Sequence, residues 1–423
     1  MRLPDADWLG RPALTVLVKA LGAGQARYVG GAVRDTLLGL SVKDVDIATP
    51  LEPQEVMRRL AAHAIQVIPT GIDHGTVTAI IEGGAVEITT LRHDVSTDGR
   101  RATVAFAQDW QDDAARRDFT INALYADPET LEIFDYFGGW EDLQTRRLRF
   151  IGDAHERIRE DHLRILRYFR FQARFGSHPA DETAEKACSE LAATLKGLSR
   201  ERVGMEMMNL LGLLDPAPTV ARMAQLGVLG EVLPEADVAA LAGLVAEEAR
   251  QGVEPDALRR LAALIPADVS LAEGVASRFR LSGAQKKRLA LAAGRQNSPP
   301  LGEVASRSDD GGGLPAQAPP PAAVPAATSP NGGELANARA LAYRLGRPAA
   351  LDRLLLTGDS VALLSGWDIP VFPLKGGDVV ARGVTAGPEV SRLLQAVEAR
   401  WIASGFDDAA VPALLDAQLA QRP

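Results

Sequence analysis

Two aspartates separated by one residue carry the clearest chemical signal in the sequence. Asp44 and Asp46 alternate with the apolar residues Val45 and Ile47. This period of two predicts a strand with both carboxylates on one face and the apolar side chains against a core. Residues two apart on a strand lie roughly 6.6 Å apart, so both carboxylates can bind divalent cations held roughly 4 Å apart. The pair indicates a two-metal centre suited to in-line displacement at phosphorus.

A glycine pair stands just upstream of these aspartates. Gly30 and Gly31 follow a short apolar run and open a predicted helix at 32–38. A glycine turn at a helix N-terminus presents unpaired N–H groups to phosphate, and Arg34 in the first turn adds positive charge. Taken separately, the glycine pair could be a simple tight turn, and the two aspartates could be the solvated face of a strand. Together and in this order, they favour a functional site.

These residues carry a resemblance to a known family. The run Gly-Gly-x-Val-Arg-Asp-x-Leu-Leu-Gly, followed by Asp-Val-Asp and Ala-Thr, resembles the head-domain signature of class II tRNA nucleotidyltransferases. That family shares the polymerase-β-like superfamily with bacterial poly(A) polymerases. The resemblance implies an α+β fold, in which a nucleotidyltransferase head with a small mixed sheet and helices precedes all-helical neck, body and tail domains.

A third carboxylate, Glu87, lies between Val86 and Ile88 on another predicted strand. Members of the superfamily commonly place a third acidic residue on such a strand, and the context Val-Glu-Ile-Thr-Thr-Leu-Arg resembles that position. The resemblance implies a catalytic role for Glu87, and an exposed strand glutamate is the alternative. The polar segment 92–101 contains an Asp-Gly turn signal and is predicted to be a mobile loop over the site.

The run Arg-Arg-Asp-Phe-Thr-Ile-Asn-Ala-Leu at 116–124 resembles the second motif of the family. Under this resemblance Arg117 meets the triphosphate of the nucleotide and Asp118 meets its ribose. From the residue pattern alone, the segment is the start of a capped amphipathic helix whose apolar side chains point inward. The segment 135–143 resembles the third motif, a glycine-bearing hinge between head and neck, and a plain turn is the alternative.

An excess of arginine marks the next segment. Nine arginines and four acidic residues lie within 145–174, although the net charge of the whole chain is −9. The acidic total argues against a protein that coats nucleic acid indiscriminately, but it permits a local basic surface. Within this segment, residues 158–175 are predicted to form one amphipathic helix.

Two residues of this helix have side chains that can read a base. Asp161 and Arg164 are three apart and therefore share one helix face. An aspartate accepts from an exocyclic amine and an arginine donates to ring acceptors. Cytosine and adenine offer both groups, whereas guanine and uracil offer the reverse pattern. The resemblance assigns this pair to the selection of C and A without a template, and Arg167 and Arg170 to nucleotide binding and placement of the pair.

The rest of the chain divides by composition. A motif at 198–206 resembles the fifth motif of the family and is interpreted as structural, with Ser199 capping a helix. Residues 298–333 contain eight prolines, six glycines and seven alanines, and they read as a linker. The predicted domains are a catalytic head at 1–143, a base-selecting neck at 144–205, a helical body at 206–297, that linker, and a tRNA-binding helical tail at 334–423.

Length and cysteine content narrow the class of protein. A chain of 423 residues has room for two to four domains. Cys188 is the only cysteine, which excludes an intrachain disulfide and thiolate zinc sites. The first residues lack a secretory apolar core, and no apolar run is long enough to span a bilayer. We therefore expect a cytoplasmic protein without a membrane partner.

The sequence predicts a template-independent enzyme that adds CCA to the tRNA 3′ end from CTP and ATP and releases pyrophosphate. Asp44 and Asp46 would bind two Mg²⁺ ions, and the oligomeric state is left open. One alternative is a bacterial poly(A) polymerase, although such enzymes tend to carry strongly basic extensions. Others are an enzyme that adds only CC or only A, and an RNA-binding protein without catalysis. The intact pairs Asp44/Asp46 and Asp161/Arg164 argue against the last, since binding alone would require neither.

Overall fold

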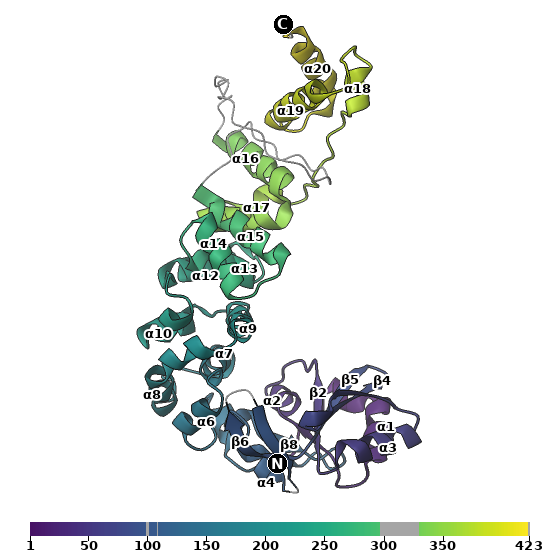
Figure 1. Ribbon diagram of the computed structural model, residues 1–423, viewed down its shortest axis with the longest axis vertical. Helices are drawn as coiled ribbons and strands as arrows, with labels where there is room; N and C mark the ends of the chain where they lie inside the picture. Colours follow the sequence, from purple (N-terminus) through teal and green to yellow (C-terminus); the bar gives the residue numbers. More distant parts are fainter. Residues whose placement is uncertain (99–100, 108, 297–329, 422–423) are drawn as a thin grey trace. The chain divides into compact units, whose positions relative to one another are not determined.

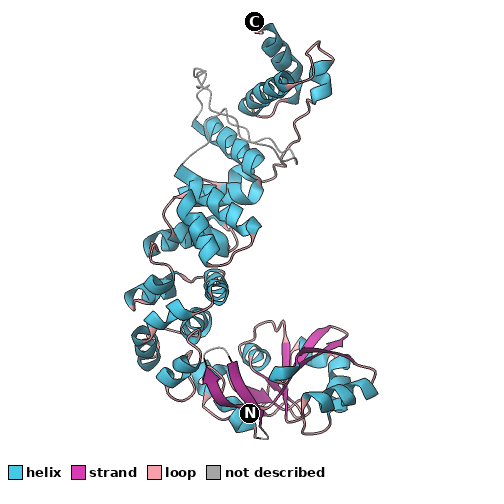
Figure 2. Cartoon of the chain, viewed as in Figure 1, coloured by secondary structure: helices cyan, strands magenta, loops and turns pink. Residues whose placement is uncertain are grey.

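The computed structural model describes residues 1–98, 101–107, 109–296 and 330–421. These residues form two compact units, Met1–Pro234 and Glu235–Pro423. Among the described residues, the strands are confined to the first unit, and the second is built of helices (Figure 2). The predicted linker lies outside the described residues except for 330–333, which belong to α16 (Pro330–Leu345). The finer division into head, neck, body and tail stays a prediction.

A seven-stranded mixed sheet forms the centre of the first unit, in the order β3-β4-β5-β2-β1-β8-β9. The neighbours β2 and β5 run parallel, and the other neighbouring pairs run antiparallel. This mixed sheet with surrounding helices confirms the predicted α+β class. Its strands are β1 (Arg27–Val29), β2 (Val45–Thr49), β3 (Gln66–Gly71), β4 (Thr76–Ile81), β5 (Gly84–Thr90), β8 (Leu124–Ala126) and β9 (Ile133–Asp135).

The central strand β2 shows the alternation expected from its sequence. Val45 and Ile47 are buried, whereas Asp46 between them is partly exposed. Asp44 precedes the first residue of β2 and is exposed. Because successive side chains of a strand point to opposite faces, the apolar pair fixes the face on which Asp46 lies.

Three helices accompany the sheet (Figure 1): α1 (Pro12–Leu21), α2 (Gly31–Leu37) and α3 (Pro53–Ala62). The run Thr-Pro-Leu-Glu at 49–52 has the sequence pattern of a capping box, which predicts a helix start there, but no such cap forms. Thr49 is the last residue of β2, and its hydroxyl donates to the carbonyl of Gln25 at 2.6 Å. The helix α3 instead begins at Pro53, whose fixed φ suits the first helical position.

The segment predicted as a loop at 92–101 contains strand structure. β6 (Arg92–Asp98) and β7 (Arg101–Phe106) pair antiparallel as a two-stranded ribbon, and residues 99–100 lie outside the described part of the chain. The run of Thr, Val, Ala and Phe in β7 suits a strand better than a loop. The predicted mobility of this segment stays a prediction.

The remaining helices of the first unit follow the sheet. The predicted helix start at 116–124 is wrong, because α4 ends at Ala115 and a short 3₁₀ turn, Thr120–Asn122, leads into β8. Phe119, Ile121 and Leu124 are nevertheless buried, as their pattern predicted. These helices are α4 (Trp110–Ala115), α5 (Gly139–Gln144), α6 (Ala154–Glu160), α7 (Arg164–Phe175), α8 (Glu182–Glu190), α9 (Arg200–Leu211), α10 (Ala217–Gln225) and α11 (Val228–Val232).

Gly139 at the start of α5 is required by a close backbone approach. A Cβ atom at this position would lie 2.2 Å from the carbonyl oxygen of Thr120, well inside van der Waals contact. The preceding Gly138 has a φ of 74°, which favours glycine. Packing therefore requires glycine at 139, and backbone conformation favours glycine at 138. The predicted role of this pair as a hinge stays a prediction.

The second unit is helical, with α12 (Val238–Gln251), α13 (Ala257–Leu264), α14 (Val269–Arg278), α15 (Gly283–Ala293), α16, α17 (Arg347–Thr357), α18 (Gly376–Val380), α19 (Pro388–Ala403) and α20 (Val411–Ala420). In α19 the sequence spacing predicts an apolar stripe, of which Val390, Leu393 and Val397 are buried and Leu394 is partly buried. Buried charges pair between other helices: Asp352 accepts from Arg259 and Arg288. Over the described ranges, we find no helix with the length and apolar character needed to cross a membrane.

Candidate active site

The register of the two parallel strands brings two predicted carboxylates together. In the β2–β5 pairing Asp46 is opposite Glu87, and Asp44 is two residues before Asp46. Glu87 is exposed, as is Asp44, while its strand neighbours Val86 and Ile88 are buried. The three carboxylates thus gather at one end of β2, although Glu87 is far from the aspartates in the sequence.

The charges of this group act on one another. Burial, first, and then the neighbouring Glu87 and Asp44 raise the pKa of Asp46 from 3.8 to about 6, while the charge of Arg117 lowers it. Ionised carboxylates held this close repel one another, and a bound cation relieves that repulsion. The electrostatics of the group therefore favour a cation beside Asp46.

The donor set fits a hard divalent ion that takes its remaining ligands from a substrate and from water. Within the described ranges, no group of three or more His, Cys, Asp and Glu side chains is arranged to hold a metal ion by itself. Mg²⁺ commonly binds one or two carboxylates together with substrate phosphates and water, rather than a cage made only of protein. Asp44 and Asp46 supply oxygen ligands of that kind.

The glycine turn lies beside Arg117, which the sequence predicts to contact the triphosphate. Gly30 has a φ of 68°, and a Cβ atom there would lie 3.4 Å from Nη1 of Arg117. The Gly30 N–H donates to the carbonyl of Leu124, so this N–H is not one of the unpaired groups expected from the sequence. Gly31 begins α2, where the N–H groups of the first turn have no partner inside the helix.

Arg34 is buried, whereas an arginine that binds phosphate at the start of a helix is expected to be accessible. Its guanidinium donates to Asp35 and Asn122 and lies 4.2 Å from the ring centre of Phe175 on α7. Burial chiefly lowers the pKa of Arg34, against the charge of Asp35. In this structure Arg34 joins α2 to α7, and its predicted phosphate contact stays a prediction.

Two side chains that the sequence did not indicate surround Arg117. Nη2 of Arg117 donates to Asp113 at 3.2 Å, and its Nε donates to the Tyr125 hydroxyl at 3.1 Å. An aspartate four residues before an arginine is a pairing signal when both lie on one helix. The sequence predicted a helix beginning at 116, which left Asp113 outside it, whereas α4 includes Asp113. Tyr125 gave no sequence signal, since its strand reads as core.

Asp118 and Arg167 form a pair. The two nitrogens Nε and Nη2 of Arg167 donate to Oδ2 of Asp118, at 2.9 and 2.5 Å. Burial alone would raise the pKa of Asp118, but the charge of Arg167 and hydrogen bonds from Asn122, Arg167 and the Phe119 N–H hold it below its usual value. The carboxylate is therefore ionised and oriented at neutral pH.

Arg170 extends this pair along α7. Its Nε donates to Glu206 of α9 at 2.6 Å, and Glu206 also lies 3.7 Å from Nη1 of Arg167. Arg167 and Arg170 are thus joined through one carboxylate, which fixes their spacing next to Asp118.

The predicted base-reading pair does not lie on one continuous helix. Asp161 ends α6 in an extended conformation, and α7 begins only at Arg164. Arg164 donates to Glu160 and to the carbonyl of Arg157, whereas Asp161 accepts from Arg202 of α9 at 2.5 Å. The assumption of a single helix at 158–175 is wrong. The assignment of Asp161 and Arg164 to base selection stays a prediction.

The motif containing Ser199 also differs from its interpretation. Ser199 is at the N-cap position of α9, but its side chain makes no capping hydrogen bond. Arg202, three residues later, instead holds Asp161. The fifth motif therefore contacts a predicted site residue directly.

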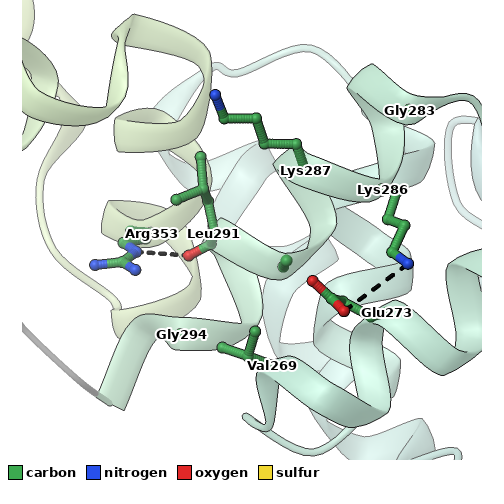
Figure 3. Close-up of a pocket in the computed structure, with 9 residues that line it drawn as sticks. Val269, Glu273, Gly283, Lys286, Lys287, Leu291, Gly294 and Arg353 are labelled. Carbon is green, nitrogen blue, oxygen red and sulfur yellow. Dashed lines mark hydrogen bonds and ion pairs between the residues drawn. The ribbon is translucent and has the colours of Figure 1, made fainter. Parts of the chain in front are cut away.

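A pocket of about 440 Å³ lies in the second unit, between α14, α15 and α17 (Figure 3). Lys286 pairs with Glu273 at 3.8 Å, and Arg353 donates to the carbonyl of Leu291. None of the predicted site residues lines this pocket. Its lining is Val269, Glu273, Gly283, Lys286, Lys287, Ala290, Leu291, Gly294 and Arg353.

Comparison with family models matches two parts of the chain. Residues 26–149 match a model described as the poly A polymerase head domain. Residues 180–239 match one described as a probable RNA and SrmB-binding site of polymerase A. The first match spans the sheet and the three carboxylates.

Known proteins resemble the chain over half of its length or more. It is 34% identical over 394 residues to the human mitochondrial CCA tRNA nucleotidyltransferase 1, covering 90% of this chain and 84% of that protein. It is 44% identical over 214 residues to a CCA-adding enzyme of Streptococcus pneumoniae, covering 50% and 52% of the two chains.

Solved structures show the same fold. The CCA-adding enzyme of Bacillus stearothermophilus in complex with CTP superposes with a TM-score of 0.67 at 24% identity, covering 97% of this chain and 99% of that chain. The Thermotoga maritima CCA-adding enzyme complexed with tRNA gives a TM-score of 0.66 at 20% identity, covering 99% of each chain.

Proposed function

The chain belongs to the family of CCA tRNA nucleotidyltransferases, and from this premise we propose that it adds C, C and A to the 3′ end of tRNA from CTP and ATP. In each addition the 3′-hydroxyl oxygen of the RNA bonds to the α-phosphorus of the nucleotide, and the bond to pyrophosphate breaks. The observation that carries this proposal is the register around β2: Asp46 is opposite Glu87 on one side and opposite Val29, the residue before the glycine turn, on the other.

We assign the carboxylates to metal binding and catalysis. Asp44 and Asp46 would hold two Mg²⁺ ions, with Glu87 as a third catalytic carboxylate. Bound there, divalent ions supply the charge that lowers the pKa of the RNA 3′-hydroxyl and neutralises the triphosphate. The pKa of Asp46 is raised chiefly by burial and then by repulsion from Glu87 and Asp44, and a bound cation would offset both, which supports this assignment.

We assign the nucleotide to the space between the glycine turn and α7. Gly30, Gly31, Arg34 and Arg117 would contact phosphates, and Asp118 would contact the ribose. An ionised Asp118 would accept a hydrogen bond from a ribose hydroxyl. Arg167 and Arg170 hold positive charge beside this carboxylate.

Asp161 and Arg164 would select the base. In this structure Arg164 is held by Glu160 and by backbone carbonyls, and Asp161 is held by Arg202. Both side chains are thus fixed by the protein and need no template strand to position them. An acceptor and a donor fixed in this way fit the amine and ring acceptor of C and A.

The proposal is tested with purified protein, tRNA lacking its last three nucleotides, Mg²⁺ and labelled CTP and ATP, supplied separately and together. We expect three additions, with C before A. A long ladder with ATP alone would favour a poly(A) polymerase. Addition of only CC or only A would favour an enzyme that shares the task with a second protein, and no incorporation would favour RNA binding alone.

The cytoplasmic location is likewise a proposal, and the animal relatives are named as mitochondrial proteins.

A further inference from the structure

A buried carboxylate and a tyrosine hydroxyl hold the arginine beside the glycine turn. Asp113 is 1% exposed and Tyr125 is fully buried. Oδ2 of Asp113 accepts from the Tyr125 hydroxyl at 2.6 Å and from Nη2 of Arg117 at 3.2 Å. The Tyr125 oxygen in turn accepts from Nε of Arg117. Asp113, Tyr125 and Arg117 therefore form a closed triangle of hydrogen bonds.

This triangle leaves one end of the guanidinium facing the site. Nε and Nη2 are both engaged, and Nη1 is the atom that a Cβ at Gly30 would approach to 3.4 Å. An arginine side chain has several rotatable bonds, so a free Arg117 would lose much conformational entropy on binding a phosphate. Fixing two of its nitrogens in advance avoids most of that loss.

The second oxygen of Asp113 connects to two further parts of the site. Oδ1 accepts from Nε and Nη2 of Arg116, at 2.9 and 2.6 Å. It also lies 3.4 Å from the backbone N–H of Arg92, where β6 begins. One buried carboxylate thus contacts both arginines of the 116–124 motif and the base of the β6–β7 ribbon.

We propose that Asp113, with Tyr125, is a positioning residue that aims Arg117 at the triphosphate of the incoming nucleotide. This inference rests on the proposed function and adds to it the residues that orient the triphosphate contact. Because the triphosphate is common to both substrates, the effect must be the same for CTP and ATP.

The test is steady-state kinetics of Asp113→Asn, Tyr125→Phe and Arg117→Ala, with CTP and ATP as separate substrates. Asp113→Asn should raise KM for both nucleotides by about 10- to 100-fold with a smaller change in kcat, as expected for losing a charged hydrogen bond. Tyr125→Phe keeps the charge pair and should raise KM less. The double variant Asp113→Asn/Arg117→Ala should be no worse than Arg117→Ala alone, because Asp113 acts through Arg117.

Glu185→Gln is a matched control for lost stability. Glu185 is a buried carboxylate of α8 that pairs with Arg222 in the same unit, outside the site. The substitution Glu185→Gln should lower Tm, while KM for both nucleotides stays that of the wild type. Additive losses in the double variant, or a folded Asp113→Asn with wild-type KM, would overturn the inference. A wild-type protein that adds no nucleotide would instead overturn the proposed function.

Discussion

Replacing Asp46 by asparagine should stabilise the metal-free protein while abolishing nucleotide addition. Burial and the neighbouring Glu87 and Asp44 raise the pKa of Asp46 from 3.8 to about 6. In the unfolded chain this group ionises near its ordinary pKa, whereas in the folded chain it keeps its proton to about pH 6. The folded state therefore loses stability as pH rises from about 4 through about 6.

The size of this effect follows from the shift. A difference of roughly 2 pKa units corresponds to about 3 kcal/mol at pH 7, and the partial exposure of Asp46 reduces it to about 1–2 kcal/mol. The asparagine amide carries no charge, so Asp46→Asn should recover this free energy. For a compact unit of this size, each kcal/mol raises Tm by about 2–4 °C.

The assay is thermal unfolding in EDTA at pH 7.5 and pH 4.5. Asp46→Asn should melt above the wild type at pH 7.5, and the difference should shrink at pH 4.5, where Asp46 is protonated. Asp5→Asn, at an exposed position, should change neither value. Mg²⁺ with CTP should raise Tm of the wild type more than that of Asp46→Asn. A variant that melts below the wild type, or a difference independent of pH, would refute the reasoning.

Three further substitutions test other parts of the site and fold. Glu87→Gln should raise the Mg²⁺ concentration needed for half-maximal CTP incorporation, and unchanged activity would leave Glu87 as an exposed strand glutamate. Arg202→Ala releases Asp161 and should raise UTP and GTP misincorporation relative to CTP and ATP by about tenfold, with Arg202→Lys restoring most of the selectivity. An equal loss with all four nucleotides would instead indicate a structural role. Gly139→Ala places Cβ 2.2 Å from the carbonyl of Thr120 and should cost about 2–4 kcal/mol of stability by denaturant unfolding. An unaltered midpoint would contradict this packing.

Local pattern was sufficient to predict the strands that carry the carboxylates. Alternation around Asp46 and Glu87 placed each side chain on the correct face of its own strand. What the pattern could not supply was the partner strand, because pairing of β2 with β5 depends on the whole sheet. Sequence reasoning therefore predicted three carboxylates but not which two are opposite each other.

Helix boundaries were predicted less well, for a tertiary reason. The amphipathic spacing from Ile158 to Phe175 suits a continuous helix, yet Asp161 is extended. Its carboxylate accepts from Arg202 and from the Leu163 N–H, which a residue inside a helix could not combine with its own backbone bonds. The end of α6 thus coincides with a local hydrogen bond to Asp161 and with a contact to α9, remote in sequence, and the apolar spacing indicates neither.

Buried positioning side chains were the hardest to predict. Tyr125 lies on a short apolar strand, and nothing in its neighbourhood distinguishes its hydroxyl from that of a core tyrosine. Only the fold brings it to Asp113 and Arg117.

The parallel pairing of β2 and β5 also limits how the gene can change in length. A single inserted or deleted codon within either strand would turn every later side chain of that strand to the opposite face, moving Asp46 or Glu87 into the apolar layer. Length variation among descendants of this sequence should therefore be selected against within 45–49 and 86–90.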